Sequence, residues 1–305
     1  MDIYYFPTTS GGNKYLDLQV NIWNMLSEKC LPIVKKPTLN IFSRKNRVAI
    51  FNWLEDIPSG SKYPIVSFIQ CLAIFFYARV FFHRCIYVKH NLSPHSGNAR
   101  VYYSILSFLQ EKFFDATVTH RDDISIKYKY IEHPMYPMNI SLEKNIEYGV
   151  YGRISRYKGI SDLLDCWDKD KKLVIAGKCD DPILDDEITH KIINLGLDVD
   201  YKNVDLSEDK LDDYLARTKV IILSHNDKSA IVSGMFYHAA SFGCNVIIRD
   251  SSLGEYCSRK FSFCNLLSSL DDVDLVKENR VIEETTLCCS NEVILKSWRE
   301  ILNIP

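Results

Sequence analysis

Two cationic side chains, Arg153 and Lys158, lie in the segment YGVYGRISRYKGISDLLDCW, between a hydrophobic run and an amphipathic run. The first run predicts a strand that ends at Tyr151, and the second predicts a helix that begins near Gly159. This order places both cations at the carboxyl edge of a sheet, beside the positive end of a helix dipole. Arginine offers a planar fork of donors and lysine a compact charge, so the pair suits a diphosphate. The alternative is that both are solvated loop residues.

A second anion-binding feature is predicted at Ser233 and Gly234, which open the helical segment SGMFYHAASF. The first N–H groups of a helix are free to bind phosphate oxygens, and glycine permits close approach of the backbone. The alternative is an ordinary N-cap, in which the serine hydroxyl satisfies the first turn.

Hydrophobic periodicity predicts alternating strands and helices in both halves of the chain. In the first half, strands are expected at residues 2–6, 48–53, 85–89 and 115–119, with helices at 15–26, 63–82 and 101–114. In the second half, strands are expected at 147–151, 172–176, 199–202, 219–223 and 245–248, with helices near 160–167, 184–195, 208–216, 233–242 and 292–302. Such alternation is typical of parallel βαβ units.

The polar stretch 138–145 is the predicted linker between two doubly wound α/β domains, residues 1–143 and 144–305. The last helix could pack back on the first domain. Ligands of open α/β sheets bind beyond the carboxyl ends of the strands, so we expect the two domains to face a central cleft.

Composition excludes some function classes. The 305 residues carry a formal net charge of −2, which gives no overall attraction to nucleic acid. The ten cysteines form no CxxC pair and no secretory leader is recognised, so we expect reduced cysteines and a cytoplasmic protein. No metal site is expected, and we interpret the DVD sequence at Asp198 and Asp200 as surface charge.

The cationic segment carries a family resemblance. GRISRYKGISDLLDCW, followed by KLVIAGK, resembles the donor-domain signature of GT-B glycosyltransferases, family 4 in particular, where a G-R-x4-K-G segment precedes a helix and an L-x-I-x-G strand follows. The resemblance implies two Rossmann-like domains facing a cleft, with Arg153 and Lys158 on the diphosphate of a nucleotide sugar. It also implies a retaining hexosyltransferase whose co-substrate is that sugar, with no further cofactor.

A second match shows a departure from family 4. SGMFYHAASFGCNVIIRDSSLGEY resembles its helix and strand ending A-x3-G-x-P-V-I, although Asn245 stands where proline is usual. The family commonly carries two glutamates eight residues apart, and the matching positions here are Ala230 and His238. His238 and Glu255 are therefore candidates to contact the nucleoside or sugar. Some transferases of bacterial exopolysaccharide assembly are similar here, with a Ser-Gly step.

Three N-terminal segments, FPTTSGGNKYLDLQ, NWLED and VKHNLSPH, are similar to motifs of that subgroup, which assembles exopolysaccharide, O-antigen or capsule. His90 and Glu55 are candidate catalytic bases, because each follows a predicted strand. The remaining candidates for the acceptor or cleft are Gly11, Gly12, Asn13, Asn91 and His95. The alternatives are a loop braced by Asn91 and Pro94 with His90 in the core, and a Glu55 that is solvated or caps a helix.

The apolar run 65–82 of the predicted helix 63–82 is interrupted by Gln70 and Arg79 and falls short of the ~20 residues of a spanning helix. We favour packing of this helix in the core over contact with an anionic membrane surface, the alternative that its terminal Arg79, His83, Arg84 and Lys89 would allow.

The sequence therefore favours a cytoplasmic, metal-independent transferase that uses a nucleotide sugar and a glycan or lipid-linked acceptor, with peripheral contact to the inner membrane as an option. Two alternatives stay open. One is a nucleotide-sugar 2-epimerase of the same fold, and the other is a non-catalytic partner subunit, which the absent glutamates support.

Overall fold

The computed structural model describes residues 1–8, 13–33, 41–94, 99–226, 229–268 and 273–304. The chain forms two compact units. The first unit consists of Met1–Pro134, Ser229–Val232 and Cys289–Pro305, and the second consists of Met135–Lys228 and Ser233–Cys288. The predicted boundary at residues 143 and 144 falls in the irregular segment 131–145.

The first unit contains a six-stranded parallel sheet with the order β2-β1-β3-β4-β5-β6. Its strands are β1 (Asp2–Phe6), β2 (Lys29–Pro32), β3 (Arg47–Asn52), β4 (Arg84–Lys89), β5 (Ala116–Thr119) and β6 (Lys129–Tyr130). The four predicted strands are confirmed within one or two residues. The strands β2 and β6 were not predicted, because they are short and carry no buried hydrophobic run.

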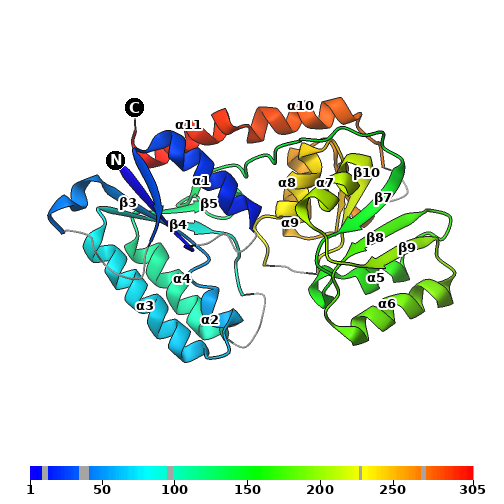
Figure 1. Cartoon of the computed structure of the whole chain (residues 1–305), viewed down its shortest axis with the longest axis horizontal. Coiled ribbons are helices and arrows are strands. Elements are labelled where there is room, and N and C mark those ends of the chain that lie inside the picture. Colours follow the sequence, from blue (N-terminus) through cyan, green and yellow to red (C-terminus); the bar gives the residue numbers. More distant parts are fainter. Residues whose placement is uncertain (9–12, 34–40, 95–98, 227–228, 269–272, 305) are drawn as a thin grey trace. The chain divides into compact units, whose positions relative to one another are not determined.

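Helices cover both faces of this sheet (Figure 1). The helices α1 (Lys14–Leu26) and α11 (Asn291–Leu302) lie on one face, and α3 (Pro64–Phe81) and α4 (Arg100–Phe113) lie on the other. A one-turn helix, α2 (Ile57–Gly60), and a 3₁₀ segment, η1 (Ile41–Asn46), complete the unit. Residues alternate along β1 and β3, so Ile3 and Ile50 face α1 while Tyr4 and Phe51 face α3.

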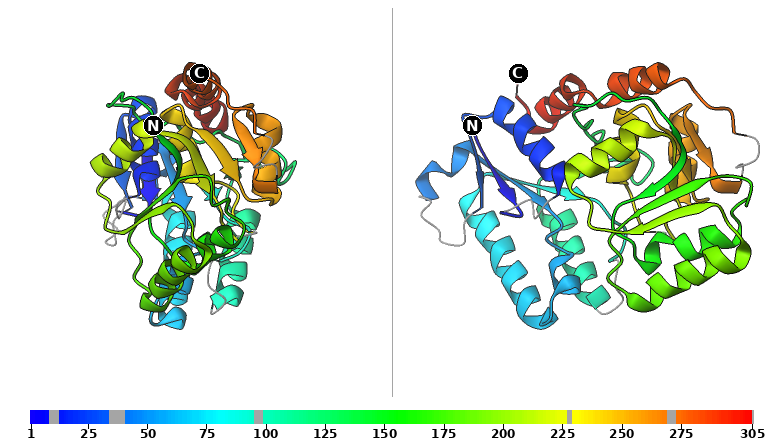
Figure 2. Two further views of the ribbon diagram at one scale, coloured as in Figure 1. Left: turned by 90° about the vertical axis from the view of Figure 1, so that its right-hand side faces the viewer. Right: turned by 45° about the vertical axis from the view of Figure 1, so that its right-hand side comes forward.

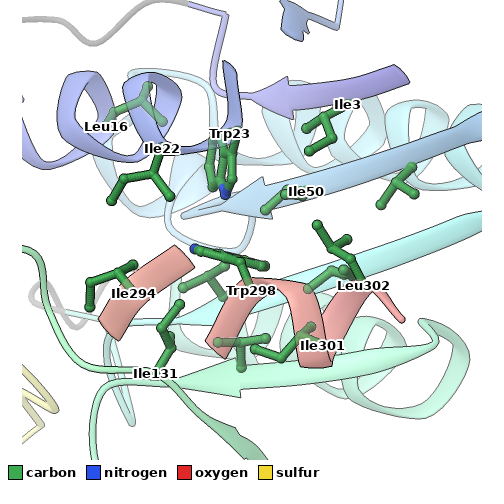
Figure 3. Packing of buried hydrophobic residues seen from close by; sticks show 14 residues of the cluster. Ile3, Leu16, Ile22, Trp23, Ile50, Ile131, Ile294, Trp298, Ile301 and Leu302 are labelled. Atoms are coloured by element: carbon green, nitrogen blue, oxygen red, sulfur yellow. The ribbon is translucent and has the colours of Figure 1, made fainter. Parts of the chain in front are cut away.

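The last helix of the chain, α11, is part of the first unit. Figure 3 shows Trp23 of α1 and Trp298 of α11 pointing toward each other, with their ring centroids 5.6 Å apart and nearly perpendicular. The indole N–H of Trp298 donates to Oε1 of Gln19 at 2.9 Å. Such edge-to-face packing is favourable between aromatic rings, and it fastens the C-terminal helix to the N-terminal one.

The second unit repeats the architecture with the parallel order β12-β11-β10-β7-β8-β9. Its strands are β7 (Ile146–Tyr151), β8 (Leu173–Gly177), β9 (Val199–Asn203), β10 (Thr218–Leu223), β11 (Asn245–Ile248) and β12 (Cys264–Leu266). Five of these were predicted. The three-residue β12 was not, because it is too short to show a pattern.

Two helices, α5 (Ile160–Asp165) and α6 (Pro182–Leu195), pack on one face of this sheet, and α7 (Glu208–Arg217) and α8 (Gly234–Ser241) lie on the other, as Figures 1 and 2 show. The helices α9 (Ser252–Lys260) and α10 (Glu278–Cys289) follow and were not predicted.

The strand order reverses once in each unit. In the first unit the chain leaves β1 for β2 and returns to β3, and in the second it leaves β7 for β8 and β9 and returns to β10. Ligands of doubly wound sheets bind at this switch point, beyond the carboxyl ends of the two strands. In the second unit, that position brings together the loops after Tyr151 and Leu223.

Candidate functional site

The loop that carries Arg153 turns immediately after β7. Gly152 has a left-handed φ of 96°, and its N–H donates to the carbonyl oxygen of Ala176 at 3.1 Å. Gly177 lies so close that a Cβ on it would stand 1.8 Å from the carbonyl oxygen of Gly152. Both positions therefore require glycine, the first for its backbone conformation and the second for the contact.

The turn that carries Lys158 is fastened to the loop after β10. Arg156–Lys158 forms one 3₁₀ turn that ends at Gly159, whose φ is 64°. The hydroxyl of Ser224 donates to the carbonyl oxygen of Lys158 at 2.7 Å, and the N–H of Asn226 donates to that of Tyr157 at 2.8 Å. These bonds fix the lysine backbone at the switch point of the second unit.

The side chain of Lys158 contacts His225, with 2.9 Å between Nζ and Nε2. An ammonium group only donates, so the imidazole nitrogen accepts and is unprotonated in this contact. Burial lowers the pKa of Lys158 to about 8. Sequence reasoning missed His225, because a single histidine in a loop shows no motif.

Arg153 is an exposed cation of the segment. Its guanidinium pairs with Asp180 at 2.9 Å, and the arginine side chain is 75 % exposed. Exposed ion pairs contribute only about 0–1 kcal/mol, so the guanidinium can exchange Asp180 for another anion at little cost. The neighbouring Arg156 differs, because it pairs with both Asp181 and Glu187 at the start and middle of α6.

Two hollows border this loop. A pocket of about 380 Å³ is lined by Gly152, Arg153, Gly177, Lys178, Asp180, Asp205, Leu206 and Leu211. Its size falls in the range of ligand pockets, and its walls combine apolar, cationic and acidic groups. A much smaller hollow has Arg153, Lys158, Ser224 and His225 in its lining. Arg153 thus lies between the larger pocket and Lys158.

The start of α8 lies beside the same loop. A Cβ on Gly152 would stand 3.7 Å from Cε of Met235, in the first turn of α8. Ser233 is the buried N-cap residue, and its side chain makes no capping hydrogen bond. The ordinary N-cap interpretation is therefore wrong, and the first amides of α8 have no side-chain acceptor from Ser233. Tyr136, which was not predicted, lies here too: a Cβ on Gly234 would stand 3.1 Å from its hydroxyl.

His238 lies in the interior of the second unit. Its Nε2 is 2.7 Å from Oδ1 of Asp212 in α7, and its ring stacks on Tyr136 with centroids 4.2 Å apart. It is absent from the lining of both hollows described above. Glu255 is exposed in the first turn of α9, after β11, and it too is absent from these linings.

In the first unit, His90 belongs to a cluster at the carboxyl edge of the sheet. Its ring stacks on Trp53 with centroids 4.3 Å apart and meets Tyr15 edge-on at 5.0 Å. Two further histidines, His120 and His133, complete the cluster, with centroids 5.3 and 5.0 Å from that of Tyr15. Trp53 has a left-handed φ of 55°, a strained conformation that is typical of functional sites.

Hydrogen bonds set the protonation of this cluster. The amide nitrogen of Asn52 donates to Phe6, so its Oδ1 faces Nε2 of His90 at 3.0 Å and accepts the imidazole proton. This leaves Nδ1 of His90 as a base. Burial lowers the pKa of His90 well below its usual value and that of His120 to about 4. Both imidazoles are therefore neutral at neutral pH.

The loop after His90 pairs with a distant segment of the first unit. The N–H of Leu92 donates to Ser229 at 2.8 Å, and that of Ile231 donates to His90 at 3.1 Å, on either side of an Asn91–Ala230 bridge. The resemblance to family 4 aligns its first glutamate with Ala230. The segment 90–92 thus pairs through its backbone with the segment 229–231, which the sequence did not predict.

Glu55 is fully buried, so the interpretation of Glu55 as a solvated residue is wrong. Its carboxylate accepts hydrogen bonds from the Tyr87 hydroxyl at 2.6 Å and from the Gln110 amide at 3.3 Å, and burial raises its pKa to about 7. Asn13 caps α1 by accepting from the N–H of Tyr15. The other acceptor candidates, Gly11, Gly12 and His95, lie outside the described residues.

Within the described part of the chain, no group of three or more His, Cys, Asp or Glu side chains could hold a metal ion. Asp200 of the DVD sequence pairs with Lys202 at 2.7 Å on the surface.

Comparison with solved structures identifies the architecture. The chain resembles HepE of Anabaena, solved with UDP and glucose, with a TM-score of 0.65 and 12 % identity over 99 % of both chains. It also resembles sucrose-phosphate synthase of Thermosynechococcus elongatus, with a TM-score of 0.67 and 11 % identity over 99 % of this chain and 98 % of that chain. The chain has the GT-B fold.

A glycosyltransferase of Rickettsia africae is a further GT-B neighbour, with a TM-score of 0.59 and 13 % identity over 98 % of this chain and 97 % of that chain. No family model and no curated protein matches the sequence. The GT-B fold, with its two six-stranded parallel sheets and flanking helices, confirms the predicted fold class.

Proposed function

We propose that the protein is a glycosyltransferase that moves a hexose-type sugar from a nucleotide-diphosphate sugar to a glycan or lipid-linked acceptor. One observation carries this proposal: in a GT-B fold, Arg153, Lys158 with His225, and the start of α8 gather around one loop of the second unit, beside a pocket of about 380 Å³. The acceptor class, a role in bacterial surface polysaccharide synthesis and a cytoplasmic location are proposed from the motif resemblance.

The proposed donor site separates two tasks. The pocket lined by Gly177, Asp205 and Leu206 would hold the nucleoside, and the cations at its edge would hold the diphosphate. HepE was solved with UDP-glucose, so UDP-sugars are the first donors to test. No metal is needed in this proposal, because Arg153, Lys158 and the α8 amides would stabilise the charge that develops on the leaving diphosphate.

The proposed transfer joins the acceptor oxygen to the anomeric carbon and breaks the bond between that carbon and the diphosphate oxygen. The electron pair of the broken bond leaves with the nucleoside diphosphate. His90 is the proposed acceptor of the hydroxyl proton, because its Nδ1 is a base and its Nε2 proton is held by Asn52. Retention of the anomeric configuration is proposed from the resemblance to family 4, and it requires the acceptor oxygen to attack from the face of the sugar that the diphosphate leaves.

The test is a binding and turnover panel without added metal. We expect one or more of UDP, GDP and ADP to bind, and the matching sugar to release nucleoside diphosphate when an acceptor is present. Arg153→Ala and Lys158→Ala should each weaken binding by about tenfold or more, as expected for lost charge-assisted bonds of about 1.5–3 kcal/mol. Arg156→Ala is the matched control, since its ion pairs join it to α6.

A non-catalytic binding subunit is the second candidate, favoured by Ala230 and His238 at the usual glutamate positions and by the burial of Glu55. Tight nucleotide binding without turnover of any donor and acceptor would support it. Formation of an epimer from the donor alone would instead identify an epimerase. If no nucleotide binds, or if Arg156→Ala weakens binding as much as Arg153→Ala does, the donor site is wrong.

A further inference from the structure

The helices α3 and α4 of the first unit expose an apolar surface. They lie side by side on one face of the sheet (Figures 1 and 2), and Phe68 of α3 stacks on Tyr102 of α4 with centroids 4.9 Å apart. Each helix buries one side against the sheet. The opposite sides present large exposed side chains, and we call the set formed by Val66, Ile69, Phe76, Val80, Ile105 and Phe108 the α3–α4 surface.

The helix α3 is apolar on its exposed side as well as on the side that packs in the core. Ser67, Cys71, Phe75 and Ala78 are its buried residues, and their spacing marks one face. Among the described residues it is the one helix long and apolar enough to cross a membrane, with a mean hydropathy of 1.7, yet only 22 % of it is buried. The expectation that core packing explains its aromatics is thus met on one face only.

Around the α3–α4 surface, the described charges that form no ion pair are cationic. Lys62 precedes α3, Arg100 begins α4 and Lys112 lies in its last turn; all three are exposed, and in the described part of the chain none forms an ion pair. No acidic residue occurs in α3. The nearby acids are already engaged, Asp115 with Arg79 at 3.1 Å and Glu111 with Lys89 at 2.5 Å.

We propose that the α3–α4 surface docks on an anionic lipid bilayer. Its apolar side chains would enter the boundary between headgroups and acyl chains, and Lys62, Arg100 and Lys112 would meet anionic headgroups. The same surface of a second copy would present the same cations, and the acids described beside them, Asp115 and Glu111, are already paired, so charge complementarity favours lipid over self-association. Both helices begin at the carboxyl edge of the sheet, the edge at which Trp53 and His90 lie.

The test is co-sedimentation of the full chain with vesicles of phosphatidylcholine alone or mixed with phosphatidylglycerol. We expect the wild type to bind the mixed vesicles, with an affinity that weakens as salt is added. The affinity of Ile69→Glu/Phe76→Glu for these vesicles should be lower by about tenfold or more. These side chains are 59 and 61 % exposed. The matched control is Ile183→Glu/Ile193→Glu on α6, at 72 and 68 % exposure, which should bind like the wild type.

Lys62→Glu/Arg100→Glu should remove the preference for anionic lipid. Sedimentation velocity without vesicles should show one species in all variants, with thermal unfolding confirming the fold. The proposal is overturned if the wild type does not bind mixed vesicles, if the α6 control loses binding equally, or if Ile69→Glu/Phe76→Glu abolishes self-association instead. Vesicle binding is independent of nucleotide binding, so this test can fail while the donor site stands.

Discussion

Lys158 and His225 form a direct contact, with 2.9 Å between the lysine ammonium and the unprotonated imidazole nitrogen. The two residues follow β7 and β10, the strands on either side of the switch point in the second unit. A lysine held in this way is pre-positioned, and its lowered pKa makes its charge sensitive to pH near neutrality.

Nucleotide binding should therefore weaken in mild alkali. The pKa of Lys158 is about 8; below it the ammonium is charged and attracts a diphosphate, and above it the charge is lost. We expect the affinity for the preferred nucleoside diphosphate to fall by up to about tenfold per pH unit above this value. Titration calorimetry between about pH 6.5 and about pH 9.5 measures this. Lys158→Arg keeps its charge, and the same decline in that variant would contradict the assignment.

Substitution of Gly177 should damage both stability and nucleotide binding. Gly177→Ala places a Cβ against the Gly152 carbonyl, and such overpacking costs about 1–3 kcal/mol in the free energy of unfolding. Because it moves the loop of Arg153, binding should weaken as well. Gly196→Ala is the control, since it has a left-handed φ but no atom within 4 Å of its Cβ. Urea unfolding measures the stability of both variants, and calorimetry measures their nucleotide binding. If Gly196→Ala weakened binding as much as Gly177→Ala, the proposed role of the Gly152–Gly177 contact in binding would be wrong.

Replacing His90 should slow transfer without changing donor affinity. His90→Gln can keep a hydrogen bond to Asn52 but cannot take a proton, so we expect the turnover rate to fall by about 10²–10⁴. The dissociation constant of the nucleotide should stay unchanged, because the donor residues lie in the second unit. His83→Ala, an exposed histidine after α3, should behave like the wild type. Unchanged turnover in His90→Gln would remove His90 as the base.

Glu55 should make the protein less stable as the pH rises. Its pKa in the fold is about 7, above that of an exposed glutamate near 4.3, so the fold favours the protonated carboxyl. This stabilisation is complete below the unfolded pKa and is lost as the pH rises through about 7. Between about pH 5 and about pH 8, the wild type should lose ~1–3 kcal/mol more of its unfolding free energy than Glu55→Gln. If urea unfolding showed the same loss of unfolding free energy with pH in the wild type and in Glu55→Gln, the prediction would be wrong.

The sequence predicts the sheets better than the site. Long buried runs such as those of β3 and β10 leave a clear pattern, while the two-residue β6 and three-residue β12 do not. The spacing of Arg153 and Lys158 reveals a candidate anion site, because both cations lie on one local turn. The contact with His225 joins residues 67 positions apart and depends on which strands are neighbours. Local pattern carries no such information.

The sequence also did not predict which polar side chains are buried. His238 and Glu55 look like accessible candidates in the sequence, yet Asp212 and Tyr87 engage them in the interior of their units. Those partners lie in other elements, so only the packed fold reveals them. The segment Ser229–Val232 likewise joins the first unit through backbone hydrogen bonds to His90 and Leu92, and such bonds leave no pattern in the side chains of the sequence.

The second unit is proposed to hold a nucleotide through its diphosphate, and the decisive measurement compares the binding of a nucleoside diphosphate with that of the nucleoside monophosphate. Calorimetry of the wild type should show tighter binding of the diphosphate, UDP over UMP if uracil is the preferred base. In Arg153→Ala/Lys158→Ala the two should bind with nearly equal affinity, while Arg156→Ala keeps the difference. An unchanged preference for the diphosphate in Arg153→Ala/Lys158→Ala would contradict the account.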